Sequence, residues 1–288
     1  MEHTENSKKL RVYFDTNAVN FFFGEFEGRS KHPFKRYDIL FSWPLLDEIK
    51  CCSSSFREMG LAEFMWQVSN RKILLGIEEL MLLEIQSLLK GETISFSSYI
   101  DTKSEYLEAW KEARKGTTPN DVRIELRLAI RNEKERILSR FRKGRKRWLP
   151  KFRSNMPLPK NWTSAYASLL KEKEFNEVIY FMMKTFGFLD QFDDPEAIFD
   201  IDHEKLCCTS IGLEFYIALW FLIDSQPKKQ GSPDLGDIYD MKHAFYVGLS
   251  DYFVTGDQRV YHILHDLIDT KSAKIIWLEE FHKQLRGA

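Results

Sequence analysis

The stretch LRVYFDTN, residues 10–17, decides the expected fold of this chain. Its first five residues form a short apolar and aromatic run, which is typical of a buried strand. The run stops at Asp15, Thr16 and Asn17, whose side chains favour turns and helix caps. The stretch therefore predicts a strand over residues 10–14 that is followed directly by a helix.

The same pattern of strand and helix recurs on both sides of a long middle segment. Before that segment, the run 38–42 is followed by a helix that Pro44 opens. The run 71–75 is followed by an apolar-rich helix over 77–90. After the middle segment the pattern predicts a helix, a strand, a helix and a last strand, over 237–249, 252–255, 258–268 and 274–278.

Alternating strands and helices predict an α/β core, which we place in residues 1–91 and 232–288. We expect a three-layer sandwich with a mostly parallel central sheet. The residues between them, 92–231, have long stretches of mixed charge and few strand-like runs, which predicts a large helical insertion. A chain of 288 residues is long enough for one such core and a second element.

Composition and the first residues point to a cytoplasmic protein. The chain is 43% hydrophobic and 30% charged, and no apolar run approaches the roughly 18 residues that a membrane span needs. The first nine residues are polar and lack the pattern of a secretory signal. The adjacent pairs Cys51–Cys52 and Cys207–Cys208 are expected to be reduced packing residues and not zinc ligands.

Two opposite excesses of charge are hidden by the net charge of −1. The segment 136–160 has basic residues and no acid, and the segment 190–204 has acids and no lysine or arginine. The basic segment could bind a single strand through cations and aromatic rings, or it could be a solvated face that the acidic segment balances. A third possibility is that the acidic segment masks the basic one. The candidate nucleic-acid contacts are Arg140, Arg142, Lys143, Arg145, Lys146, Arg147 and Trp148.

Four acids stand at the expected strand ends or in early turns of helices: Asp15, Glu48, Asp240 and Asp257. In open parallel sheets the functional crevice lies beyond the carboxyl ends of the strands. Two carboxylates about 4 Å apart repel by roughly 4 kcal/mol at an effective dielectric of about 20, so a cluster requires a cation. Oxygen ligands without thiolates favour Mg²⁺ or Mn²⁺. Such an ion can activate water for phosphodiester hydrolysis.

Four stretches together resemble, in order, the acidic signatures of the PIN-domain ribonuclease superfamily. They are VYFDTN (12–17), WPLLDEI (43–49), DMKHA (240–244) and DYFVTGD (251–257). The resemblance covers about residues 1–90 and 232–288. It implies a PIN-like fold in which the four acids bind Mg²⁺ or Mn²⁺ and cleave RNA, commonly single-stranded, with Thr255 or Asn17 as hydrogen-bonding support.

Some members of that superfamily are toxins of bacterial toxin–antitoxin modules, so the resemblance also makes a protein inhibitor or antitoxin a candidate partner. The insertion 92–231 is far longer than a minimal toxin carries. A simple toxin assignment does not account for it.

Each acid also has a structural explanation. Asp15 could cap the helix that follows it, and Glu48 could face solvent. Asp237 and Asp240 stand near a helix start, where acids favour the macrodipole, and Asp237 is the one assigned a supporting, structural role. His243 is expected to pack or hydrogen-bond, because the acids already supply hard ligands. The joint placement of the acids on one edge favours the metal site.

The resulting hypothesis is a metal-dependent endoribonuclease that hydrolyses single-stranded RNA. The alternative is a catalytically weak or inactive PIN-like module that binds RNA. An aspartate-based phosphatase would need a second aspartate two positions after Asp15, where the chain has Asn17. The sequence contains no glycine-rich phosphate loop, which argues against a nucleotide-driven machine.

Overall fold

The computed structural model describes residues 9–26, 33–52, 54–129, 172–225, 235–268 and 273–287, with the single positions 131, 132, 135 and 139. The basic segment 136–160, apart from position 139, lies outside the described residues.

A parallel sheet of four strands forms the centre of the described structure. The strands are β1 (Leu10–Phe14), β2 (Tyr37–Leu40), β3 (Tyr252–Thr255) and β4 (Lys274–Trp277), in the order β2-β1-β3-β4. In the parallel register Val12 aligns with Ile39 on one side and with Tyr252 on the other. The prediction of an α/β protein with a parallel sheet is confirmed, as are the bounds of its first and third strands.

The strand predicted over 71–75 is wrong in its extent. Only Leu74 makes a bridge, parallel with Ser42 and antiparallel with Ile100. Asn70 and Arg71 have φ angles of 53° and 62°, in the left-handed region, so the chain is still turning where the strand was expected to begin. The segment therefore extends the sheet beyond β2 by a single residue pair.

The helices begin and end as follows: α1 (Thr16–Phe26), α2 (Trp43–Lys50), α3 (Ser55–Val68), α4 (Ile77–Lys90), α5 (Ser104–Lys115), α8 (Glu172–Phe186), α9 (Cys207–Ser225), α10 (Leu235–Ala244), α11 (Gln258–Ile268) and α12 (Leu278–Arg286). Short 3-10 helices are η1 (Pro33–Arg36), η2 (Phe96–Tyr99), η3 (Leu189–Gln191), η4 (Pro195–Asp200), η5 (His203–Lys205) and η6 (Val247–Leu249).

The helix predicted over 237–249 is wrong at its C-terminal end. Helix α10 ends at Ala244, and the chain continues through a turn into η6. The reason is a close approach of two backbones, because a Cβ on Gly248 would lie 2.4 Å from the Cys207 carbonyl oxygen. The 3-10 turn of η6, which is tighter than an α-helical turn, brings Gly248 against the start of α9.

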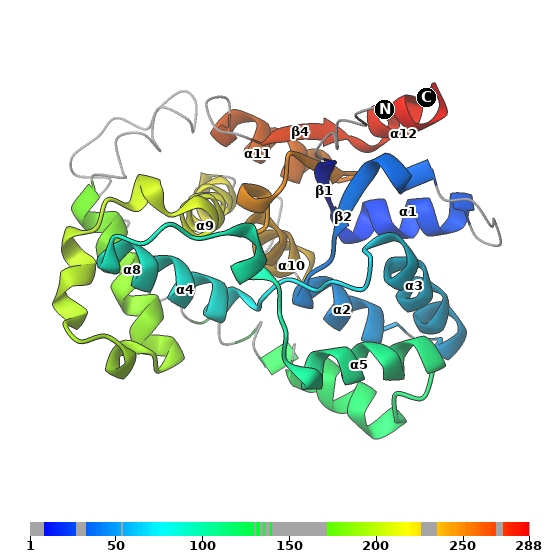
Figure 1. The fold of residues 1–288 in the computed structure, drawn as a ribbon, viewed down its shortest axis with the longest axis horizontal. Coiled ribbons are helices and arrows are strands. Elements are labelled where there is room, and N and C mark those ends of the chain that lie inside the picture. Colours follow the sequence, from blue (N-terminus) through cyan, green and yellow to red (C-terminus); the bar gives the residue numbers. More distant parts are fainter. Residues whose placement is uncertain are drawn as a thin grey trace, which may run out of the picture.

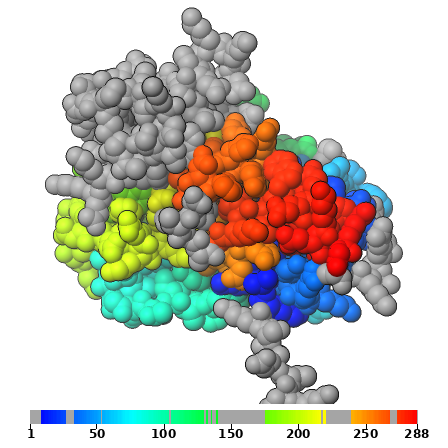
Figure 2. All heavy atoms as spheres, turned by 90° about the horizontal axis from the view of Figure 1, so that it is seen from above, coloured from blue at the N-terminus to red at the C-terminus, as the bar shows by residue number. Residues whose placement is uncertain are grey.

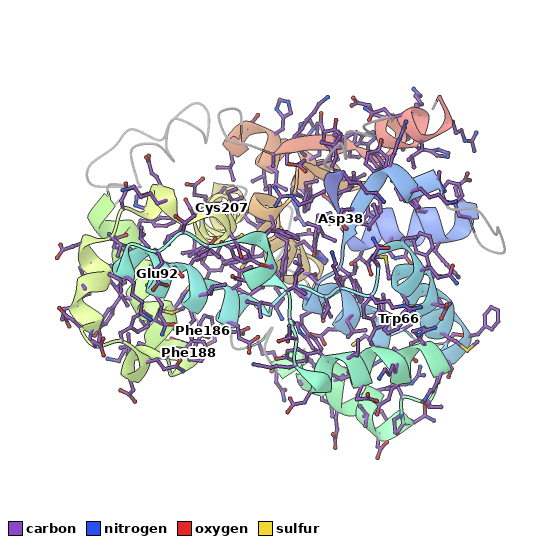
Figure 3. All side chains as sticks on the ribbon, in the orientation of Figure 1. Asp38, Trp66, Glu92, Phe186, Phe188 and Cys207 are labelled. Carbon is purple, nitrogen blue, oxygen red and sulfur yellow. The ribbon has the colours of Figure 1, made fainter. Side chains whose placement is uncertain are left out.

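Helices cover both faces of the sheet, so the core has three layers. Side chains of a strand alternate between the two faces. Tyr13 and Phe253 pack into one apolar cluster with α4, α8, α9 and α11, while Phe14 and Val254 pack into a second cluster with α1, α3, α5 and α12. Figure 1 shows these two groups of helices on opposite sides of the strands. Trp66 on α3 and Phe186 at the end of α8 mark the two sides in Figure 3.

Helices of the predicted insertion share this core. Helix α9 packs against α4, α10 and α11. The buried Glu84 of α4 accepts hydrogen bonds from the N–H groups of Cys208 (2.9 Å) and Thr209 (2.8 Å) in the first turn of α9. A carboxylate at a helix N-terminus is favoured by the unpaired N–H groups and the helix dipole. Helix α9, which belongs to the segment 92–231, is therefore joined to the core by polar and apolar contacts alike.

The first and last parts of the chain lie side by side, as the pairing of β1 with β3 requires. Figure 2 shows the C-terminal residues, in orange and red, next to the early residues in blue. No helix among the described residues is long and apolar enough to cross a membrane.

Gly212 provides a test of how tightly α9 is packed on this core. A Cβ at that position would lie 2.3 Å from Cγ of Phe245, whereas a Cβ at Gly24 in α1 would meet no atom within 4 Å. Overpacking a core costs about 1–3 kcal/mol, so Gly212→Ala should lower the free energy of unfolding in urea by that amount. Gly24→Ala, the matched control, should raise it by roughly 0.5–1 kcal/mol. Equal effects of the two substitutions would contradict the packing of α9 described above.

Candidate functional site

The candidate site lies at the carboxyl ends of the two central strands. From β1 the chain crosses to β2 on one side, while β3 and β4 lie on the other side. The order of strands therefore reverses between β1 and β3. In open α/β sheets this reversal opens the crevice in which ligands bind. Asp15 follows β1 directly, and Asp257 stands two residues after the end of β3.

Asp15 is the most buried acid of the site, with a relative exposure of 3%. Its Oδ1 accepts the N–H of Ala18 at 2.7 Å, and its Oδ2 accepts the hydroxyl of Thr255 at 2.5 Å. Burial raises the pKa of the Asp15 carboxyl from 3.8 to about 6, against the effect of these two hydrogen bonds. Asp15 thus caps α1, as its structural explanation required, and it also bridges β1 to β3.

Glu48 points from α2 towards the same edge of the sheet. Its Oε2 accepts hydrogen bonds from the Thr16 hydroxyl and from Nε2 of His243, the latter at 2.9 Å. The Glu48 side chain is 19% exposed, so the prediction of a solvent-facing residue does not describe it. The charge of Glu48 contributes to the raised pKa of Asp15, whereas His243 opposes it. These two carboxylates therefore interact electrostatically.

A chain of buried hydrogen bonds stands behind Glu48. The hydroxyl of Tyr13 lies 2.7 Å from Nδ1 of His243 and 2.6 Å from Oγ of Ser42. Burial raises the pKa of the Tyr13 hydroxyl well above its ordinary value, so the group keeps its proton. His243 hydrogen-bonds as expected, but the sequence analysis missed Tyr13 and Ser42. A tyrosine hydroxyl among the apolar residues at the end of β1 was the available signal for Tyr13.

Asp257 caps the helix that follows β3. Its Oδ1 accepts the N–H groups of Arg259 (2.8 Å) and Val260 (3.0 Å), and its own N–H donates to Oγ1 of Thr255 at 3.0 Å. Thr255 is thereby bonded to both Asp15 and Asp257, which is the supporting role predicted for it. Asn17, the other predicted support, is exposed.

Gly256 fits this edge because of close packing and not because of a positive φ angle. Its φ angle is not positive, and a Cβ there would lie 3.2 Å from Cδ2 of Leu278. The glycine allows the end of β3 to approach the start of α12.

Asp240 is directed elsewhere. Its Oδ2 lies 3.5 Å from Nη2 of Arg259, and its side chain is 16% exposed. Asp237 belongs to α10, and only its backbone is described. The structure therefore brings Asp15, Glu48 and Asp257 to the carboxyl edge of the two central strands and pairs Asp240 with an arginine from the first turn of α11.

The donor set suits a hard divalent cation in its chemistry. Asp15, Glu48 and Asp257 offer carboxylate oxygens, and Mg²⁺ typically uses one or two carboxylates and completes its shell with water and phosphate. Within the described part of the chain, no three side chains of His, Cys, Asp or Glu form a group that could hold a metal ion. The three acids therefore share the ligand chemistry of such an ion, but as described they do not form a closed protein cage around one.

The predicted nucleic-acid contacts cannot be placed on this edge. Arg140, Arg142, Lys143, Arg145, Lys146, Arg147 and Trp148 lie outside the described residues. The four cysteines are all described and none of them forms a disulfide; Cys208 is buried and Cys207 is exposed.

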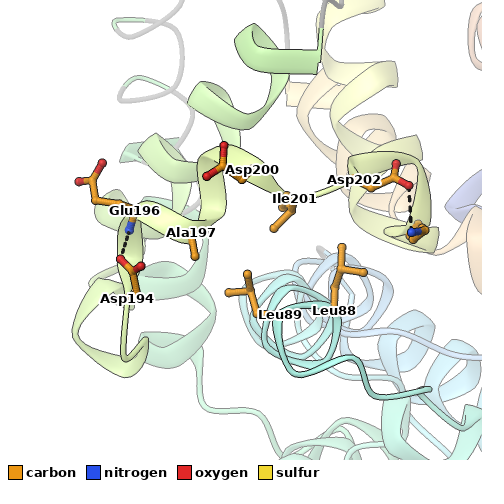
Figure 4. A pocket seen from close by; sticks show the side chains of 9 residues that line it. Leu88, Leu89, Asp194, Glu196, Ala197, Asp200, Ile201 and Asp202 are labelled. Carbon is orange, nitrogen blue, oxygen red and sulfur yellow. Dashed lines mark hydrogen bonds and ion pairs between the residues drawn. The ribbon is translucent and has the colours of Figure 1, made fainter.

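A separate groove of about 490 Å³ lies between α4 and the η4–η5 segment. Figure 4 shows Leu88 and Leu89 projecting towards Ala197 and Ile201. The acids that line the groove are Asp194, Glu196, Asp200 and Asp202, against the single cation Lys205. This excess of negative charge repels phosphate, so the groove does not fit a nucleic-acid strand. The carboxyl edge of the sheet remains the candidate site.

Comparison of the chain with protein-family models, with curated proteins and with solved structures gave no match.

Proposed function

We propose that this chain is a metal-dependent nuclease of the PIN type that hydrolyses single-stranded RNA. The observation that carries the proposal is the buried carboxylate of Asp15 at the reversal of strand order, within electrostatic reach of Glu48. A bound cation would offset the cost of keeping a carboxylate ionised in such a place. The parallel sheet and the helical layers support the PIN-like fold without distinguishing it from other α/β folds.

Asp15, Glu48 and Asp257 would hold Mg²⁺ or Mn²⁺. When bound, the ion supplies Lewis acidity towards water and towards a phosphodiester oxygen. The side chains of the protein orient the carboxylates, because Thr255 fixes Asp15 while Thr16 and His243 fix Glu48. Asp240 is left out of this set, because its Oδ2 pairs with Nη2 of Arg259.

A second function, RNA binding without cleavage, is favoured by one specific observation. Asp240 is paired with Arg259, and Glu48 accepts a hydrogen bond from His243. Internal partners of this kind can satisfy carboxylates that a nuclease would present to its metal ion. The two functions share a surface and differ in whether products form.

Cleavage of labelled single-stranded RNA distinguishes the two functions. The purified chain should produce fragments with Mn²⁺ and none after a chelator is added. Salt-sensitive binding of the same RNA without fragments, over a full titration with Mn²⁺, would contradict the nuclease proposal and support the binding module.

A further inference from the structure

The position of the Glu48 carboxylate is fixed at one of its two oxygens. Both donors, the Thr16 hydroxyl and Nε2 of His243, reach Oε2. A side chain on a helix ordinarily samples several rotamers, and two donors on one oxygen restrict it to one. Oε1 of Glu48 is thereby held in a constant direction relative to the strand ends.

The tautomer of His243 follows from these partners. An ionised carboxylate only accepts hydrogen bonds, so Nε2 carries the hydrogen that Glu48 accepts. In a neutral ring Nδ1 is then an acceptor, and the hydroxyl of Tyr13 donates to it. The Tyr13 oxygen is left to accept the hydroxyl of Ser42. With a neutral His243 ring, one consistent direction of donation runs from Ser42 to Glu48.

Packing fixes the ring of Tyr13, which lies between Ser42 and His243 in this chain of hydrogen bonds. Tyr13 is fully buried and stacks on Tyr246 with a centroid distance of 5.3 Å, and on Phe253 with a centroid distance of 5.6 Å. His243 itself is only 2% exposed. Neither ring can turn to another partner without opening the core.

We propose that Tyr13 and His243 are positioning residues that hold Glu48 in the orientation needed to bind the divalent cation. This inference rests on the proposed function, and it adds a buried chain of hydroxyl and imidazole groups to the acids. A metal ligand ordinarily depends on the groups that orient it, and loss of one such group costs about 10–100-fold in metal affinity. We expect a loss of cation affinity in the same range when the Tyr13 hydroxyl is removed.

The affinity of the full chain for Mn²⁺, followed by the electron paramagnetic resonance signal of the free ion, tests the proposal. Tyr13→Phe should weaken binding by about 10–100-fold. Tyr246→Phe is the matched control, since Tyr246 is equally buried and stacked and donates its hydroxyl to the Leu75 carbonyl at 2.9 Å. Tyr246→Phe also removes a buried hydroxyl, but this hydroxyl takes no part in the hydrogen bonds that lead to Glu48. The Mn²⁺ affinity of Tyr246→Phe should therefore equal that of the wild type.

A double variant shows whether Tyr13 acts through Glu48. In a Glu48→Gln background the additional Tyr13→Phe change should leave Mn²⁺ affinity where Glu48→Gln alone puts it. If Tyr13→Phe does not fold, Ser42→Ala removes the donor to the same hydroxyl and should weaken binding in the same direction.

Two outcomes would overturn the inference, and they differ in what they imply for the proposed function. Equal Mn²⁺ affinity in the wild type, Tyr13→Phe and Tyr246→Phe would exclude the positioning role and leave the nuclease proposal standing. Absence of Mn²⁺ binding in the wild type would refute the proposed function and the positioning role with it.

Discussion

Asp15→Asn is expected to abolish cation-dependent RNA cleavage and, without a cation, to make the protein more stable at neutral pH. The loss of activity should exceed the roughly 10–100-fold that is typical for partners of a metal ligand, because Asp15 is assigned as a ligand itself. Asparagine has nearly the same shape, and its carbonyl oxygen can still accept the N–H of Ala18. The fold should therefore survive the change.

The gain in stability follows from the raised pKa of Asp15. The carboxyl titrates at about 6 in the folded chain and at 3.8 in the reference state, so between these values the folded state binds more protons than the unfolded state. Stability then falls as the pH rises through this window and stays low above it. The difference corresponds to about 3 kcal/mol at neutral pH, at about 1.4 kcal/mol per pKa unit. An asparagine does not titrate and avoids this cost.

Urea unfolding of the cation-free proteins at mildly acidic and at neutral pH measures the effect. The wild type should lose stability between the two conditions, whereas Asp15→Asn should lose less and should exceed the wild type at neutral pH. A variant that is less stable than the wild type at neutral pH would contradict the account of a carboxylate buried at an energetic cost. Retained cleavage by pure Asp15→Asn would contradict its assignment as a ligand.

Arg123→Met is expected to cause the largest loss of stability, about 3–5 kcal/mol, because it leaves the buried Glu58 without its cation. Arg123 is paired with Glu58 inside the molecule, at side-chain exposures of 6% and 0%. The Thr118 hydroxyl donates to the other oxygen of Glu58 at 2.6 Å, and Nε of Arg123 donates to the Thr118 carbonyl at 3.1 Å. This cluster ties the helical segment 120–129 to α3.

The pH dependence of Arg123→Met has a definite sign. Burial raises the pKa of Glu58 in the wild type, and Thr118 and Arg123 oppose that rise. Without Arg123 the folded pKa rises further above the ordinary 4.5, so stability should fall as the pH increases from there. The defect should therefore be smaller in mildly acidic solution than at neutral pH, as measured by urea unfolding.

A double variant completes this second test. Glu58→Gln combined with Arg123→Met removes both charges, and it should recover most of the stability lost by Arg123→Met alone. Additive losses in the double variant would show that the two side chains act independently, contrary to the contact between them.

The sequence predicted the elements whose patterns are local. An apolar run that ends in turn residues identified β1 and β3 with their bounds, and a glycine after the last apolar turn identified the end of α4 at Lys90. The prediction of a strand over 71–75 was wrong because Asn70 and Arg71 both have positive φ angles. The pattern of apolar residues gives no sign of such angles. Local patterns therefore identified these elements but did not reveal the unusual backbone angles at Asn70 and Arg71.

The site was predictable only in part, and for a related reason. Asp15 follows β1 directly and Asp257 stands two residues after β3, so the rule for parallel sheets places them on one edge. The contact between Tyr13 and His243 depends on which face of β1 meets α10, and that is decided by tertiary packing. The pairing of Asp240 with Arg259 likewise depends on how α10 and α11 approach each other.

Thermal unfolding of the cation-free protein during a titration with Mn²⁺ tests most directly whether the gathered carboxylates share a divalent ion. A ligand that binds only the folded state raises the midpoint of unfolding as its concentration increases. We expect a rise for the wild type and none for Asp15→Asn, even though the variant starts from the higher midpoint. Equal responses of the two proteins to Mn²⁺ would contradict the account.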